Sequence, residues 1–117
     1  SMVLSNPVTV NVLGALSIVI GSLNAWDPET STAVTKVTVD AGETVTFYAK
    51  YSFNRPPEPE EASTYRLKVD IYVNDRLQTT IYRDFQEGSQ VGSFSFTLSF
   101  AEAGTYVVKV DVNLVPR

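Results

Sequence analysis

The chain has 117 residues, a net charge of −4, and neither cysteine nor histidine. This length predicts a single domain with a sufficient apolar core, and the acidic charge argues against nucleic acid or an anionic membrane as a partner. Without cysteine there are no disulfides or thiolate metal sites, and without histidine the commonest general base is missing.

Alternation of apolar and polar residues recurs along the chain, which is typical of strands with one buried face. In the first half it marks Val8–Leu13, residues 16–20 and residues 37–39. Between them, Asn24–Ala33 is predicted to be a loop that holds the single tryptophan, Trp26.

The second half of the chain carries the longer alternating segments. The predicted strands are 45–53, 65–73, 77–85, 94–100 and 106–113. Asn74-Asp75-Arg76 is predicted to be a tight hairpin turn, because Asn and Asp tolerate left-handed backbone. Residues 54–63, NRPPEPEEAS, are predicted to be a solvated loop, because proline cannot join a central ladder.

Eight short strands without an amphipathic helix of ten residues predict an all-β fold. Strands that are apolar on one side must bury that side, which favours a two-sheet antiparallel β-sandwich of the immunoglobulin-like kind. A jelly roll is the alternative. The predicted centre of the core consists of Phe47, Val69, Phe96, Leu98 and Val110.

Three stretches resemble a known family. They are VTVDAGETVTFYAKYSF from Val37, YRLKVDIYVNDRLQTT from Tyr65 and SFSFTLSFAEAGTYVVKVDVN from Ser93. Together they resemble CARDB domains, immunoglobulin-like domains of bacterial and archaeal cell-surface proteins. The resemblance implies an extracellular or cell-surface location, with a virion surface as a variant. Tyr106, shortly after Gly104, is also predicted to form a tyrosine corner, its hydroxyl bonded to nearby backbone.

The chain departs from that pattern at both ends. A further strand usually follows the one predicted at Thr105–Asn113, whose edge would otherwise stay unpaired. Val8–Leu13 is a surplus strand at the other end. We expect it to fill this position within its own chain, and strand addition to a neighbouring molecule is the alternative.

The two termini resemble remnants of expression tags. Ser1-Met2 resembles a protease scar before a start codon, and Leu-Val-Pro-Arg at 114–117 matches what thrombin leaves after removing a tag. A native strand end is the alternative for residues 114–117. This interpretation assigns residues 3–113 to a single β-sandwich domain.

Acidic side chains are the first candidates for chemistry. Glu58, Glu60 and Glu61 share one loop, and Asp27 and Glu29 share another. Carboxylates need fixed spacing in a cleft for glycoside hydrolysis, so we predict no enzyme activity and no cofactor. Calcium accepts loop carboxylates, but no calcium-loop spacing is present, so calcium is a minor alternative and no metal ligand is assigned.

Exposed aromatic side chains are the second candidates, because they can stack on sugar rings. Trp26, Tyr48, Tyr72 and Tyr82 fall on loop or outward positions, where cross-strand packing is the alternative role. The candidate ligand contacts are Trp26, Asp27, Glu29, Tyr48, Tyr72 and Tyr82.

The function expected from these features is structural. The chain is predicted to be a non-enzymatic structural or adhesive module of an extracellular, filament or virion surface assembly, with other domains or subunits of that assembly as partners. A small carbohydrate- or calcium-binding module is the alternative. Nucleic acid binding is not expected, because the chain is acidic. Membrane insertion is not expected, because no run of about 18 apolar residues occurs.

Overall fold

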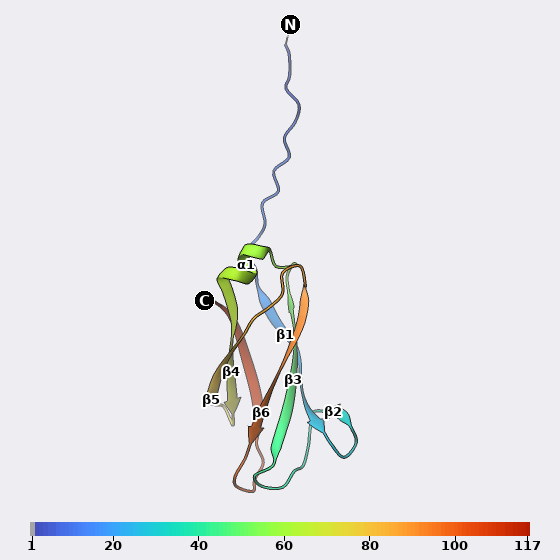
Figure 1. Cartoon of the computed structure of the whole chain (residues 1–117), viewed down its shortest axis with the longest axis vertical. Coiled ribbons are helices and arrows are strands. Elements are labelled where there is room, and N and C mark those ends of the chain that lie inside the picture. Colours follow the sequence, from blue (N-terminus) through green and yellow to red (C-terminus); the bar gives the residue numbers. More distant parts are fainter. Residues whose placement is uncertain (1) are drawn as a thin grey trace.

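The computed structural model describes residues 2–117, which form seven strands and one short helix. The elements are β1 (Ile18–Asp27), β2 (Thr32–Val34), β3 (Thr44–Phe53), α1 (Pro59–Thr64), β4 (Tyr65–Val73), β5 (Arg76–Arg83), β6 (Val91–Ser99) and β7 (Val108–Pro116). They build two antiparallel sheets, β2-β1-β3-β6 and β5-β4-β7 (Figure 1). The predicted two-sheet sandwich is confirmed.

The strand order corresponds to that of an immunoglobulin-like sandwich. β1-β3-β6 match its strands A-B-E, and β4-β7 match its neighbouring strands C-F. In that fold a last strand, G, pairs with the free side of F. β7 is accordingly an edge strand here, so the position that Val8–Leu13 was predicted to fill is open in this structure.

The core lies between the inward faces of the two sheets. On β3 all five predicted inward side chains are buried, from Val45 to Phe53, and they face the fully buried Leu67, Val69 and Ile71 of β4. Of the predicted core centre, Phe47, Val69 and Phe96 are buried. Leu98 and Val110 are half-buried and pack against the core from edge strands, where one flank stays open.

Two turn features confirm local predictions. Asn74 and Asp75 adopt positive φ angles of 51° and 63° at the β4–β5 hairpin, the conformation that a tight hairpin requires. The Tyr106 hydroxyl donates a hydrogen bond of 2.6 Å to the backbone carbonyl oxygen of Glu102. Its ring stacks on Phe100 with ring centroids 4.3 Å apart, so the tyrosine corner is present.

Other local predictions are wrong. Residues 24–33 are not one loop: β1 continues to Asp27, and β2 begins at Thr32. Residues 37–39 form no strand, although Val37 and Val39 pack against the core. Residues 59–64 form α1, because Pro59 occupies the first turn and the Glu61 carboxylate accepts the backbone amide of Glu58 at its start.

β7 also runs further than predicted. It continues past Asn113 to Pro116, with Leu114 opposite Leu67 and Pro116 opposite Tyr65. The terminal residues interpreted as a tag remnant therefore extend the sheet in this structure.

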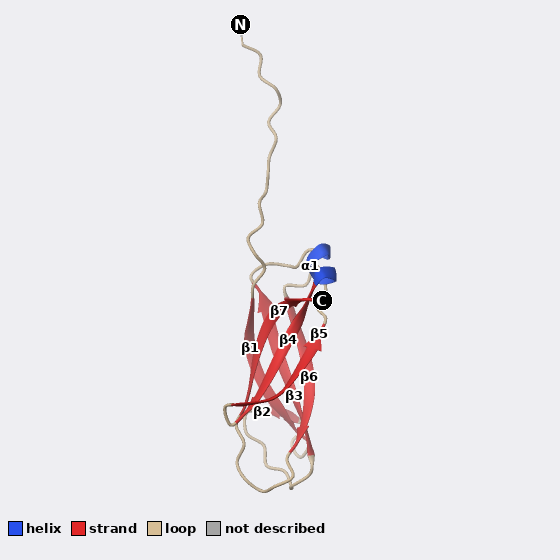
Figure 2. Cartoon of the chain, turned by 90° about the vertical axis from the view of Figure 1, so that its left-hand side faces the viewer, coloured by secondary structure: helices blue, strands red, loops and turns tan. Residues whose placement is uncertain are grey.

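The N-terminal segment stands apart from the sandwich. Met2–Leu13, called the arm below, forms neither helix nor strand, so the strand predicted at Val8–Leu13 is absent from the described chain. The arm projects beyond α1 along the long axis (Figure 2), and the molecule measures 85 × 28 × 20 Å.

Candidate functional site

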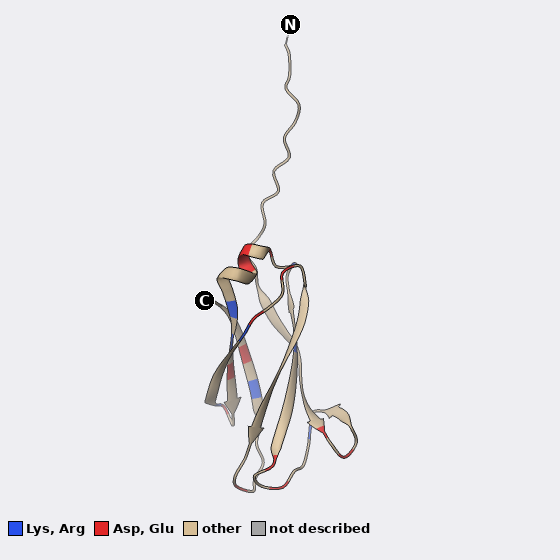
Figure 3. Cartoon of the chain, viewed as in Figure 1, with Lys and Arg blue, Asp and Glu red and all other residues tan. Residues whose placement is uncertain are grey.

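The arm exposes an apolar pattern to solvent. Val8, Val10 and Val12 are 81%, 76% and 88% exposed, and in an extended chain alternate side chains lie on one side. The arm carries no charged residue (Figure 3). Exposed apolar patches on globular proteins mark interaction surfaces, so the arm is the strongest candidate for a contact with another molecule.

A set of hydrogen bonds fixes the base of the arm. The Asn54 side chain donates to the carbonyl oxygen of Ala15 at 2.9 Å and accepts from the Ser17 amide at 2.9 Å. The Arg55 guanidinium donates twice to the carbonyl oxygen of Gly14, at 3.0 and 2.8 Å. The direction in which the arm leaves the domain is therefore set by side chains.

Glu61 holds Arg55 in place. The two form a bidentate pair at 2.7 and 2.8 Å, and Glu61 also accepts the Glu58 amide at the start of α1. The hydrogen bond from Arg55 keeps the pKa of Glu61 below its usual range. We call Asn54, Arg55 and Glu61 the clamp. The acids predicted only to solvate this loop thus include one with a structural role.

The clamp explains why the favoured prediction for Val8–Leu13 is wrong. Filling the open position beside β7 of the same chain would require a reversal at Gly14 and Ala15. Both carbonyls are held by the clamp, and the arm points away from the sandwich (Figure 1). The arm therefore does not pair with its own domain in this structure.

The sandwich has an incompletely covered side where β1 meets β7. β1 pairs with β2 only over Ala25–Asp27, so Ile18–Asn24 has one free edge, and β7 pairs only with β4. The two strands lie next to each other across the sandwich. We call this region, Ile18–Asn24 and Val108–Pro116, the seam.

Apolar side chains line the seam without being fully covered. They are Ile18, Ile20, Leu23, Val108, Val110 and Leu114, all half-buried against the core. At the end of the seam opposite the arm lies a pocket of about 580 Å³. Its apolar lining includes Leu23, Val37, Val39, Tyr106 and Val108.

The aromatic candidates divide between the two outer faces. Trp26 on β1 and Tyr48 on β3 meet edge to face with centroids 6.4 Å apart, and they are 39% and 44% exposed. Tyr72 and Tyr82 lie on the other sheet, and the Arg66 guanidinium covers the Tyr82 ring at 3.9 Å. The six predicted contacts therefore do not form one surface.

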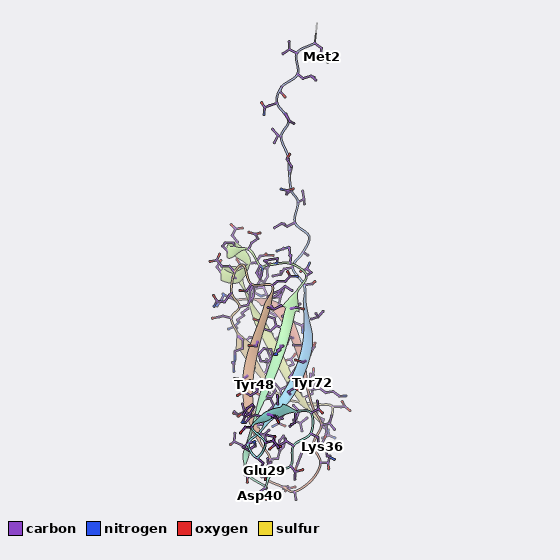
Figure 4. The ribbon with its side chains drawn as sticks, turned by 90° about the vertical axis from the view of Figure 1, so that its right-hand side faces the viewer. Met2, Glu29, Lys36, Asp40, Tyr48 and Tyr72 are labelled. Carbon is purple, nitrogen blue, oxygen red and sulfur yellow. The ribbon has the colours of Figure 1, made fainter. Side chains whose placement is uncertain are left out.

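The acidic candidates do not gather around a common point. Glu29 lies at the pocket end of the domain (Figure 4), whereas Glu58, Glu60 and Glu61 belong to α1 or precede it at the other end. Asp27 accepts the Glu29 amide at 3.0 Å within the β1–β2 turn. Among residues 2–117 no three acidic groups are placed to hold a metal ion.

No family model, curated protein or solved structure matches the chain. The resemblance to CARDB domains therefore stays a prediction. No helix in the described part of the chain is long and apolar enough to cross a membrane.

Sequence reasoning missed the clamp. Asn54 and Arg55 stand at the start of a proline- and acid-rich segment, which suggested a solvated loop. A signal was available: Glu58 and Glu61 have the spacing of reciprocal helix capping, although the usual first residue is serine or threonine.

Proposed function

We propose that this protein is a non-enzymatic structural module of an assembly built from several copies or subunits, such as a filament or a cell or virion surface layer. One observation carries the proposal: a long, uncharged, apolar arm is held away from a domain that has an open strand edge. Both features are costly for an isolated molecule, since exposed apolar side chains and unpaired edges promote association.

The surface location and an adhesive role rest on the resemblance to CARDB domains. The absence of histidine and cysteine from the sequence agrees with a role without catalysis.

The first test is whether association depends on the apolar side of the arm. We expect the protein to self-associate as its concentration rises, measured by sedimentation velocity and electron microscopy. Val10→Asp should abolish association, because it places a charge among the arm's valines. Thr9→Asp carries the same charge on the opposite side and serves as the matched control. A protein that stays monomeric at every concentration tested would contradict the proposal.

A second candidate function is carbohydrate binding on the outer face of the four-stranded sheet. The Trp26–Tyr48 pair favours it, and the β6 side chains beside that pair are hydroxyls. They are Ser93, Ser95, Thr97 and Ser99. Slower migration in gels containing soluble polysaccharides, lost in Trp26→Ala and kept in Tyr82→Ala, would support this function.

A further inference from the structure

We propose that Val8–Leu13 of one copy enters the seam of a second copy and pairs antiparallel with β7, so that copies join head to tail in an open chain. This inference rests on the proposed self-association and adds the acceptor, the direction and the register of side chains. The occupant is a second copy, because the arm matches the strand that is missing beside β7. It has a suitable length, a suitable chain direction and alternating apolar side chains.

The seam is a better acceptor than the other open side of the sandwich. That side lies between β5 and β6, where Phe94 and Phe96 of β6 are buried, and Leu98 of β6 and Ile81 of β5 are half-buried. The Arg83 guanidinium also bridges the two strands by donating to the Ser95 carbonyl oxygen at 3.3 Å. The seam has more half-buried apolar side chains, which are Ile18, Ile20 and Leu23 of β1 and Val108, Val110 and Leu114 of β7.

The positions of the arm and the pocket set the direction of entry. The arm leaves from the α1 end, where Arg117 donates its backbone amide to the carbonyl oxygen of Thr64 and closes that end of the sheet. The pocket opens at the opposite end, where β1 finishes and β7 begins. The arm of one copy can therefore enter the next copy at its pocket end, N-terminus first.

Entry from the pocket end makes the new pair antiparallel. β7 runs from the pocket towards α1, since Val108 lines the pocket and Pro116 lies opposite Tyr65. An arm that enters N-terminus first runs, from N to C, in the reverse direction. This is the relation of strands G and F in the immunoglobulin fold, and the antiparallel ladder is the more stable one per residue.

Length and side-chain parity fit as well. Val8–Leu13 extends over about 20 Å and the nine residues of β7 over about 30 Å, so the segment fits within the seam. Val8, Val10 and Val12 would face the core and Val12 would lie nearest the pocket. Pro7 has no amide hydrogen, so the continuous ladder begins after it.

The contact is heterologous, because the arm and the seam are different surfaces. Such contacts give closed rings when the rotation from copy to copy closes without an advance along the axis. They give open chains when each copy is also displaced along that axis. The arm lies along the long axis of the molecule (Figure 1), so each copy is displaced along that axis and an open filament results.

Disulfide cross-linking tests this arrangement in the full chain, which has no cysteine of its own. Asn11 lies on the outward side of the arm, and Lys109, Asp111 and Asn113 lie on the outward side of β7. We expect Asn11→Cys combined with one of Lys109→Cys, Asp111→Cys or Asn113→Cys to give a ladder of dimers, trimers and longer products on oxidation. Asn11→Cys alone should give no specific cross-linked product, because no two Asn11 positions meet in an open chain.

The control variant pairs Asn11→Cys with Ser93→Cys on the far edge strand β6, and it should give no ladder. A ladder from this control, or none from any β7 variant while association persists, would overturn the inference but leave the proposed function intact. Products that stop at dimers in the β7 variants would indicate reciprocal arm exchange and overturn the open chain. If neither the unmodified protein nor any variant associates, the proposed function itself is overturned.

Discussion

The arm and β3 have the same sequence pattern and opposite environments. Val8, Val10 and Val12 alternate with polar residues just as Val45, Phe47 and Ala49 do. Val45 is 4% exposed and lies opposite Leu98 of β6, whereas the arm valines are largely exposed. Alternation therefore identifies a segment suited to pairing, but the strand forms only where a partner is available.

This difference has an energetic basis. Ordering a residue costs about 1–2 kcal/mol of backbone conformational entropy, which burial and ladder hydrogen bonds must offset. β3 gains both from its neighbours β1 and β6 and from the facing sheet. The arm gains neither until it meets another surface.

The largest difference in stability should come from replacing a valine by aspartate in β3 and in the arm. Val45→Asp buries an unpaired charge near the start of β3, which should cost more than about 4 kcal/mol and leave the domain largely unfolded. Circular dichroism and urea unfolding will measure it. A folded Val45→Asp variant of nearly unchanged stability would show that β3 is less central than its burial indicates.

Phe96→Ala should cost about 3–5 kcal/mol, because it removes a buried ring from the core and leaves a cavity. Phe96 stacks on Phe47 with centroids 5.0 Å apart, so it tests the packing of β6 on β3. The free energy of unfolding in urea will measure the loss, and a loss below about 1 kcal/mol would contradict the core assignment.

Tyr106→Phe should cost about 1 kcal/mol, since it removes the hydrogen bond to Glu102 and keeps the ring on Phe100. The Phe variant separates the hydroxyl from the ring, and Tyr106→Ala, which removes both, should cost more. Equal losses in the two variants, measured by thermal unfolding, would assign the whole stabilisation to the hydroxyl and none to the ring on Phe100.

Acid should weaken the boundary between arm and domain. Because Arg55 lowers the pKa of Glu61, the clamp contributes stability that is complete above the ordinary glutamate pKa of about 4.3 and is lost as the pH falls through the lower folded value. The protection of the Ser17 amide against hydrogen exchange, relative to the intrinsic rate at each pH, should therefore fall at low pH. In E61Q this fall in protection should be absent, and an identical pH profile would contradict the assignment.

The smallest effect on stability should come from Val10→Asp. The arm valines lie in solvent, so the free energy of unfolding of the monomer should change by less than about 0.5 kcal/mol even though association is lost. A larger destabilisation, measured under dilute conditions, would mean that the arm packs on its own domain in solution.

Those parts of the fold that depend on residues close to one another in the sequence could be predicted from the sequence. The parity of β3 and β4, the Asn74-Asp75 turn and the Tyr106 corner all follow from short-range signals. The two-sheet arrangement follows in turn from strands that are apolar on one side.

Features that depend on distant partners were missed. Residues 37–39 alternate correctly, but their backbone pairs with no strand in the described chain. Trp26 was placed in a loop because the signal for β2 is three residues long. The clamp joins Gly14 to Arg55, and nothing in either segment alone indicates that contact.

The clamp also has a mechanical consequence if copies are joined through their arms. Tension along such a chain would enter each domain at Gly14–Ser17 and pass directly into β1, which continues from the arm towards the pocket end (Figure 1). β1 is paired with β3 from Ile18 to Ala25. A pull along the strand direction loads these transverse hydrogen bonds together in shear, instead of opening them one at a time from an end. The pairing of β1 with β3 would therefore resist a force well beyond the strength of any single hydrogen bond in it.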